Sequence, residues 1–191
     1  MRRQMGFFDT EEGVHEYLEM AKGHDGRELI EKLSEYLKPG STVLELGMGP
    51  GKDLELLSKR YEATGSDNSN LFVEIYRKNN PAADLLLLDA VTLDTDRRFD
   101  CIYSNKVLQH LEREHLERSV PRQSAVLEKG GLLAHALWYG SKVEEHGGLH
   151  FQFYQEADIE EIFGGLFEFI LVERYEELEP GDSIFVVLKK E

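Results

Sequence analysis

The chain has 191 residues, 41% hydrophobic and 31% charged, with a formal net charge of −15, an ordinary balance for a soluble globular protein of one domain spanning 1–191. The acidic excess argues against nucleic acid and anionic membrane surfaces as partners, and no apolar run approaches the roughly 20 residues of a membrane helix. A small-molecule partner fits this charge better, although a basic protein or peptide stays open.

Two helices are predicted to form an N-terminal preamble, 1–38. The first covers 10–22, with acidic residues in its first turn and Gly23 after its end. The second covers about 26–37 and stops at Pro39-Gly40; its predicted apolar face is Leu29, Ile30, Leu33, Tyr36 and Leu37. Strands and helices then alternate. The predicted strands are 42–46, 61–66, 84–89, 99–104, 132–138, 167–174 and 183–189, and the predicted later helices begin at 52 or cover 69–79, 112–128 and 155–163.

Three of these segments carry further expectations. The strand 84–89 is apolar throughout its middle, which indicates that it is covered on both faces. Pro121 lies inside the helix 112–128, so we expect a break or kink near Val120. The residues 139–153 form a long connection with three glycines, the kind of loop that often carries function. The last two strands are joined by a short acidic loop and should pair antiparallel.

The turn after the first strand is the most informative stretch. Glu45 stands in the apolar strand, and Gly47, Gly49 and Gly51 alternate before a helix, which is the arrangement of a nucleotide-binding strand–turn–helix unit. A dinucleotide fingerprint would need glycine at 52, where Lys52 stands, so a nicotinamide oxidoreductase is disfavoured. The pattern Glu45-x-Gly47-x-Gly49-x-Gly51 resembles that of the class I S-adenosylmethionine-dependent methyltransferases.

This resemblance implies an α/β, Rossmann-like fold with helices on both faces of a seven-stranded, mostly parallel sheet, in the order 3-2-1-4-5-7-6 with strand 7 antiparallel. It also implies S-adenosyl-L-methionine as cofactor, S-adenosyl-L-homocysteine as product, and methyl transfer by in-line displacement. The expected cofactor-binding residues are Glu45, Gly47, Met48, Gly49, Gly51, Asp67, Asn68, Asp89, Ala90 and Asn105.

Several of these residues have a specific expected role. Glu45 would support the cofactor's ammonium, because a carboxylate in an apolar strand needs a partner. Asp67 lies 20 residues beyond Gly47, where a ribose-binding acid is expected, and should be polar and near the surface. Asp89 resembles the position that holds the adenine amino group, and Asn105 begins the segment that meets the methionine part. Taken alone, either Asp67 or Asp89 could equally well be a turn residue or a helix N-cap with no role in binding.

The acceptor side is less defined. His110 is the best candidate for a general base, with a surface histidine at a helix start as the competing interpretation. The preamble 1–38 is expected to act as a lid, and the loop 139–153 to lie on the acceptor side. The candidate acceptor-site residues are Tyr17, Trp138, Tyr139, His146, His150 and Tyr154. Core packing remains an alternative for Tyr17, Trp138 and Tyr139.

Other chemistries are not favoured. His146 and His150 have the spacing of a metal pair on a helix, but Gly147-Gly148 lies between them, so no metal is expected. The single Cys101 sits in an apolar run, and Met1-Arg2-Arg3 is not followed by a signal-peptide core, which together predict a cytoplasmic protein. The open alternatives are a non-catalytic S-adenosylmethionine-binding protein of the same fold and a methyltransferase acting on proteins or peptides.

Overall fold

The computed structural model describes residues 10, 13–14 and 25–191. The predicted first helix, including Tyr17, therefore lies outside the described residues apart from positions 10 and 13–14. The helices are α2 (Arg27–Leu33), α3 (Lys52–Leu57), α4 (Asn70–Asn79), α5 (Arg113–Val126) and α6 (Glu156–Phe163), with a short 3-10 helix at Leu108–His110. The strands are β1 (Thr42–Leu46), β2 (Glu62–Asp67), β3 (Leu85–Leu87), β4 (Phe99–Asn105), β5 (Leu127–Trp138), β6 (Val143–His146), β7 (Leu149–Gln152), β8 (Phe167–Tyr175) and β9 (Ser183–Lys190).

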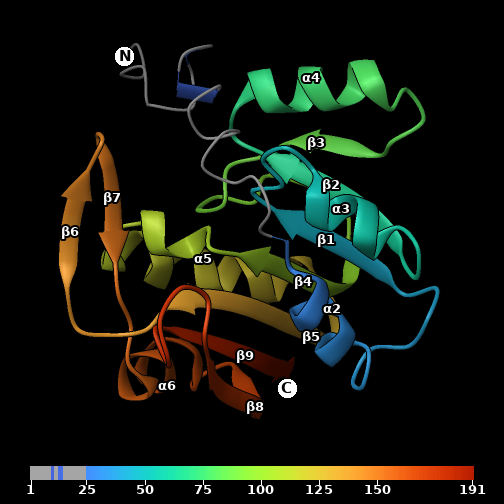
Figure 1. The fold of residues 1–191 in the computed structure, drawn as a ribbon. Helices are drawn as coiled ribbons and strands as arrows, with labels where there is room; N and C mark the ends of the chain where they lie inside the picture. The colour runs from blue at the N-terminus through green and yellow to red at the C-terminus, as the bar shows by residue number, and fades with distance from the viewer. Residues whose placement is uncertain (1–9, 11–12, 15–24) are drawn as a thin grey trace.

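Seven of these strands form one sheet in the order β3-β2-β1-β4-β5-β9-β8 (Figure 1). Strands β1 to β5 run parallel, and β9 pairs antiparallel with both β5 and β8. The predicted order 3-2-1-4-5-7-6 is confirmed, with β9 as the antiparallel seventh strand. The ligand-binding edge of such a sheet lies beyond the carboxyl ends of the parallel strands, on both sides of the point between β1 and β4 where the order reverses.

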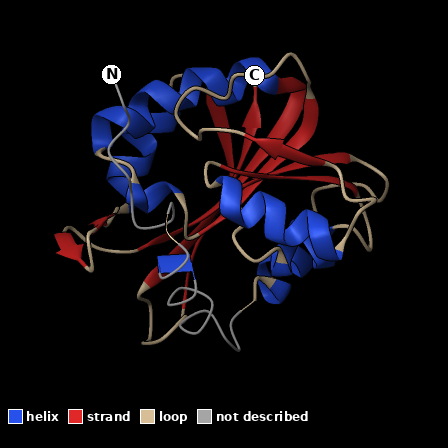
Figure 2. Ribbon diagram, turned by 90° about the horizontal axis from the view of Figure 1, so that it is seen from above, coloured by secondary structure: helices blue, strands red, loops and turns tan. Residues whose placement is uncertain are grey.

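Helices cover both faces of the sheet (Figure 2). Helices α2 and α3 pack on the face that carries Val43 and Tyr103, while α5 and α6 pack on the face that carries Leu44 and Ile102. Because side chains alternate along a strand, Glu45 shares the face of Val43. The register of β1 and β4 places Glu45 beside Tyr103. The fold therefore turns the Glu45 carboxylate toward α3.

Strand β3 departs from the expectation of a fully covered strand. It has three residues, pairs only with β2 and lies at the edge of the sheet. The side chain of Leu87 is 59% exposed. The prediction that this strand is covered on both faces is wrong, because an apolar run does not distinguish a central strand from an edge strand.

Helix α5 continues through Pro121 instead of breaking near it. Proline costs a helix interior about 3 kcal/mol. Burial of Leu116, Val120 and Val126 in the core on this side of the sheet contributes about 1.5–3 kcal/mol for each side chain. Tertiary packing therefore outweighs the lost hydrogen bond.

Tyr36 also differs from its prediction. It is predicted on the apolar face of the helix 26–37, but its side chain is 38% exposed.

The connection 139–153 is not a loop throughout, as expected, but carries the antiparallel hairpin β6–β7. Gly147 and Gly148 form its two-residue turn with φ of +59° and +77°, the positive values that a tight hairpin turn requires. The hairpin projects from the body of the protein beside the carboxyl ends of the parallel strands (Figure 1).

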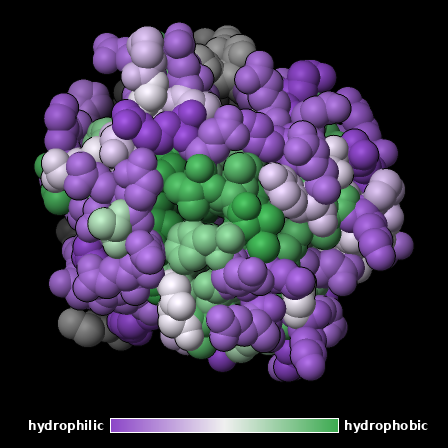
Figure 3. All heavy atoms as spheres, turned by 90° about the horizontal axis from the view of Figure 1, so that it is seen from below, coloured by the Kyte–Doolittle hydropathy of each residue, from purple (hydrophilic) through white to green (hydrophobic). Residues whose placement is uncertain are grey.

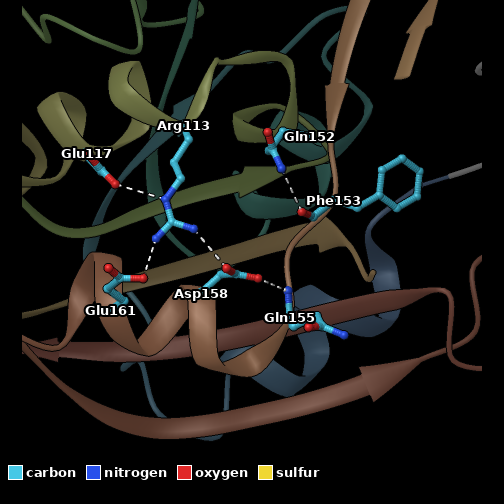
Figure 4. Close-up of polar contacts among 7 residues, drawn as sticks. All are labelled: Arg113, Glu117, Gln152, Phe153, Gln155, Asp158 and Glu161. Carbon is cyan, nitrogen blue, oxygen red and sulfur yellow. Dashed lines mark hydrogen bonds and ion pairs between the residues drawn. The ribbon is translucent and has the colours of Figure 1, made fainter. Parts of the chain in front are cut away.

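The base of this hairpin is held by an ion-pair cluster around Arg113 (Figure 4). The Arg113 guanidinium, at the start of α5, contacts Glu117 at 3.0 Å, Asp158 at 2.9 Å and Glu161 at 2.6 Å. Asp158 in turn accepts the backbone N–H of Gln155, three residues after β7 ends. This cluster fastens α5, α6 and the root of the hairpin to one another.

The underside of the molecule in Figure 1, where β8 and α6 lie, shows an apolar patch ringed by hydrophilic residues (Figure 3). Leu166, Ile170 and Val172, in and just before the edge strand β8, are between 37% and 42% exposed. Among the residues that the structure describes, no helix has the length and apolar content needed to cross a membrane.

Candidate functional site

The turn between β1 and α3 places all three of its glycines in left-handed backbone. Their φ values are +65° for Gly47, +48° for Gly49 and +81° for Gly51. A Cβ at Gly47 would lie 2.6 Å from the Val107 side chain, and one at Gly51 would overlap the Tyr76 ring. The backbone and the packing of the protein itself therefore require Gly47 and Gly51, whatever ligand the turn binds.

Asp67, at the end of β2, holds this turn in place. Its Oδ2 accepts the backbone N–H of Gly49 at 2.9 Å, and its Oδ1 accepts that of Ser69 at 2.8 Å. The residue is only 7% exposed, so the expectation of a near-surface side chain is wrong. Burial raises the pKa of Asp67, and its backbone hydrogen bonds counteract part of that shift. The carboxylate thus has a structural role in the turn beside any role in binding.

Glu45 is a buried carboxylate at this edge of the sheet with one unsatisfied oxygen. It is 3% exposed, and its Oε2 is buried with no hydrogen-bond partner among the described residues. Burial raises the pKa of Glu45 well above its usual range, and the charges of Asp53 and Asp67 raise it further. A buried carboxylate with an unused oxygen is costly unless a ligand supplies the missing donor.

A second carboxylate, that of Asp53 in the first turn of α3, organises the surroundings of Glu45. Its Oδ1 accepts the backbone N–H of Gly26 at 2.7 Å. Its Oδ2 accepts the Tyr103 hydroxyl at 2.9 Å and the Asn105 side-chain N–H at 3.1 Å. These bonds orient the Asn105 amide so that its Oδ1 remains buried without a partner in the described part of the chain. The sequence interpretation missed Asp53.

Glu45, Gly47, Asp53 and Asn105 line one cavity of about 370 Å³, a volume within the roughly 300–1,000 Å³ of small-molecule sites. One end is polar and mainly acidic, and Glu45, Asp53 and Asn105 form it together with the glycine turn, Asp25 and Lys52. The other end is bounded by the hairpin, the 3-10 helix, the end of β5 and the loop after β8. The residues of this second end are Lys106, Gln109, His110, Trp138, Leu149, Phe151, Glu177 and Leu178.

His110 is held against the hairpin at this second end. Its Nδ1 lies 2.8 Å from the backbone carbonyl oxygen of His150, and its ring contacts the Phe151 ring edge to face at 4.7 Å between centroids. A carbonyl oxygen only accepts, so Nδ1 carries a proton in this contact. Burial lowers the pKa of His110, while the bond to His150 acts in the opposite direction. The lowered pKa favours the neutral imidazole, and with Nδ1 protonated the lone pair of that neutral form is on Nε2.

The structure brings part of the predicted site together. Among the described residues, six of the predicted positions line the cavity, namely Glu45, Gly47, Met48, Asn105, His110 and Trp138. Gly49 and Gly51 shape the turn beneath it. Tyr17 lies outside the described residues.

Other predicted cofactor residues lie near the same sheet edge but not on the described cavity wall. Asp67 is buried behind the glycine turn, and Asn68 beside it is exposed. Asp89 is exposed and accepts the backbone N–H of Val91 at 2.7 Å, which is the behaviour of a turn residue. Ala90 packs partly against the core. The structure leaves the binding roles of these four as proposals.

Several candidate acceptor residues also point elsewhere in the described structure. The Tyr139 ring lies under the Arg174 guanidinium at 3.8 Å, and Tyr154 is buried in the core at 1% exposure. His146 is exposed on β6. The His150 side chain pairs with Glu145 at 2.8 Å, and only its backbone carbonyl serves the cavity, through His110.

Besides Asp53, the cavity residues that sequence interpretation missed at the second end fall into two groups. Lys106 and Gln109 lie in the segment already singled out around Asn105, so their neighbourhood was a usable signal. Leu149, Phe151 and Glu177 lie on the hairpin and on the loop after β8. Their place on the cavity wall depends on how the hairpin and this loop approach each other in the fold, and no local sequence pattern predicts that.

Comparison with known proteins agrees with this geometry. Residues 43–131 match a protein family described as "Methyltransferase domain". The chain is 37% identical over 102 residues to trans-aconitate 2-methyltransferase of Variovorax paradoxus, covering 51% of this chain and 39% of the relative. It is 34% identical over 103 residues to probable tRNA methyltransferase 9B of Mus musculus, and this match covers 53% of this chain and 22% of that relative. The chain thus matches less than half the length of these curated relatives.

Solved structures extend the likeness over nearly the whole chain. The crystal structure of Burkholderia thailandensis 1,6-didemethyltoxoflavin-N1-methyltransferase, with bound 1,6-didemethyltoxoflavin and S-adenosylhomocysteine, aligns with a TM-score of 0.79 at 16% identity. That alignment covers 94% of this chain and 84% of the other and shows a shared fold. Residues 43–131 thus match a methyltransferase domain, and the chain as a whole has the fold of the class I S-adenosylmethionine-dependent methyltransferases.

Proposed function

We propose that the protein is an S-adenosylmethionine-dependent methyltransferase that acts on a small molecule in the cavity described above. The observation that carries the proposal is a pair of buried acceptor atoms on one cavity wall, Glu45 Oε2 and Asn105 Oδ1, neither with a partner in the described part of the chain. Each such atom costs about 1–3 kcal/mol if nothing donates to it. A ligand that donates a hydrogen bond to each of these two oxygens would remove this cost.

The amino-acid end of S-adenosylmethionine meets this requirement. Its ammonium has three N–H donors and a positive charge, which suits a site formed by Glu45 with Asp53 close by. Asp67 and Asp89 remain our candidates for the ribose and adenine ends. The backbone N–H groups of Gly49, Asn68 and Ser69 all interact with the Asp67 carboxylate, and since a carboxylate has about four acceptor positions its capacity is not exhausted.

Bound S-adenosylmethionine would supply a methyl group on a sulfonium, whose leaving group is already good. The contribution of the chain is then mainly to bind and align the two reactants. We assign His110 as the general base. In the neutral form with Nδ1–H donated to the His150 carbonyl, Nε2 is the basic ring atom, and this atom would accept a proton from a hydroxyl or amine of the acceptor.

A small acceptor is favoured over a macromolecule by the cavity and the charge. The net charge of −15 opposes a phosphate backbone, although one relative is named a probable tRNA methyltransferase. Other relatives are named for trans-aconitate, and a structural neighbour holds 1,6-didemethyltoxoflavin; both names refer to small molecules. These names support the class of acceptor rather than its identity.

Equilibrium binding and a methylation screen test this proposal. Calorimetric titration should show binding of S-adenosylmethionine and S-adenosylhomocysteine and none of NAD. Incubation with labelled S-adenosylmethionine and a metabolite extract, read by mass spectrometry, should show label in a small molecule and none in added tRNA or protein. Cofactor binding with no labelled product in any fraction would favour a non-catalytic binding protein. Failure to bind either adenosyl compound would overturn the proposal.

A further inference from the structure

The acceptor end of the cavity contains a partly buried lysine, Lys106, with no carboxylate at ion-pair distance among the described residues. Lys106 follows the last residue of β4 and lines the cavity. Its Nζ donates to the Leu137 carbonyl at 3.1 Å and to the Ser183 hydroxyl at 2.6 Å, and it lies 3.8 Å from the centre of the Trp138 ring. Within the described ranges, no carboxylate lies within the 4.0 Å of an ion pair.

The backbone at this position is unusual as well. Lys106 has φ of +56°, in the left-handed region that a residue with a Cβ occupies at a cost of roughly 1–2 kcal/mol. Its backbone N–H donates to the Ala136 carbonyl at 3.0 Å, which fixes the strained turn. Strain of this kind persists where surrounding structure holds a residue in place, and it clusters at functional sites.

The charges around Lys106 do not compensate for its burial. Glu177 and Asp182, on the loop between β8 and β9, are the acidic groups that raise its pKa, and burial outweighs both and lowers the pKa to about 8. Asp182 is committed to the backbone N–H groups of Glu177, Leu178 and Glu179. Charges withdrawn from water are normally paired in proteins, so an anion beside the partly buried Lys106 would complete the site.

We propose that Lys106 binds a carboxylate of the acceptor, whose body lies against the apolar wall formed by Trp138, Leu149 and Phe151. This inference rests on the proposed function, because it takes this end of the cavity as the acceptor site. The ammonium of the cofactor would then bind at the end of the cavity formed by Glu45 and Asp53, and the carboxylate of the acceptor would bind at Lys106. The charges of the two ends would therefore determine which reactant binds at which end.

Paired probes that differ only in charge test the assignment. Benzoate and succinate are titrated against benzamide and succinamide, each with protein saturated with S-adenosylhomocysteine. At least one carboxylate should bind at least about 10-fold more tightly than its neutral partner, as one charge-assisted hydrogen bond implies. This preference should fall about tenfold per pH unit above pH 8, as Lys106 loses its proton.

Variants distinguish binding from a structural role. Lys106→Met should abolish the preference for the carboxylate, whereas Lys106→Arg should retain it. Lys142→Met removes a lysine whose side chain is 72% exposed near the hairpin and should leave the preference unchanged. If Lys106→Met does not fold, the pH dependence in the wild type and the Lys106→Arg result decide the question.

Two failures have different meanings. Protein that does not bind S-adenosylhomocysteine overturns the proposed function and this inference with it. Protein that binds S-adenosylhomocysteine but shows no preference for either carboxylate, or a preference that survives Lys106→Met, overturns the role of Lys106 alone.

Discussion

Replacing Glu45 with glutamine should stabilise the unliganded protein while weakening cofactor binding. The substitution keeps the shape of the side chain and removes a buried charge whose Oε2 has no partner among the described residues. The glutamine amide is still polar at the position of Oε2, but burying it costs less than burying an ionised carboxylate, because a charge loses more hydration than a neutral amide. We therefore expect the variant to gain about 1–2 kcal/mol, which corresponds to roughly 2–8 °C in Tm for a chain of this size.

Binding should change in the opposite direction. A hydrogen bond to a charged group contributes about 1.5–3 kcal/mol, so Glu45→Gln should weaken S-adenosylhomocysteine binding by about 10- to 100-fold. Calorimetric titration measures the affinity, and a thermal melt without ligand measures the stability. Glu144→Gln, on the exposed strand β6, is the matched control and should change neither quantity.

The stability gain should also depend on pH with a definite sign. Burial raises the pKa of Glu45 in the folded state above its usual value of 4.5. The wild type therefore binds this proton more readily when folded and becomes relatively more stable as pH falls through the raised pKa. The advantage of Glu45→Gln should be full above that pKa and should shrink as the pH approaches 4.5. A variant that melts below the wild type at pH 8 and binds S-adenosylhomocysteine equally well would refute this reasoning.

Three further substitutions test other parts of the site. Gly51→Ala should lose at least about 2 kcal/mol of stability, since the new Cβ overlaps the Tyr76 ring, whereas Gly148→Ala, with positive φ but nothing within 4 Å, should lose only about 1 kcal/mol in the same urea titration. Asp67→Ala should lose about 1–3 kcal/mol and also bind S-adenosylhomocysteine more weakly, because it releases the glycine turn. His110→Gln should lower kcat, and the fall of wild-type kcat below the lowered pKa of His110 should be absent from its pH profile.

Each of these has a clear contrary result. Equal losses for the two glycine variants would mean that strain, and not the Tyr76 contact, explains the requirement at Gly51. Full stability of Asp67→Ala would show that the turn does not need this carboxylate. An unchanged pH profile in His110→Gln would remove His110 from proton transfer.

The order of the sheet was predictable because each strand carried its own signal. Apolar runs such as Thr42 to Leu46, ended by glycine or aspartate, mark strands that lead to the ligand-binding edge. The hairpin β6–β7 was overlooked although its Gly147-Gly148 turn is a hairpin signal. Its flanking residues are mostly polar and lack the apolar alternation that normally identifies a strand.

The site could be predicted only in part. Glu45 could be predicted because a carboxylate within an apolar strand is costly to bury unless it has a partner. That argument needs only the local sequence and not the neighbours of Glu45 in space. The link between Asp53, Tyr103 and Asn105 depends on the register of β1 against β4 and on the turn that sets α3 above them. The position of Lys106 depends on β9, which supplies Ser183 from 77 residues away. Contacts of this range have no local pattern.

The central claim, that Glu45 with Asn105 binds the ammonium of S-adenosylmethionine, is tested most directly by a double cycle of two ligands and two proteins. S-adenosylhomocysteine and 5′-methylthioadenosine, which lacks the amino-acid end, are titrated into the wild type and into Glu45→Gln. The wild type should strongly prefer S-adenosylhomocysteine, and the substitution should reduce that preference by about 10- to 100-fold while leaving 5′-methylthioadenosine binding unchanged. A preference that is the same in both proteins would contradict the account.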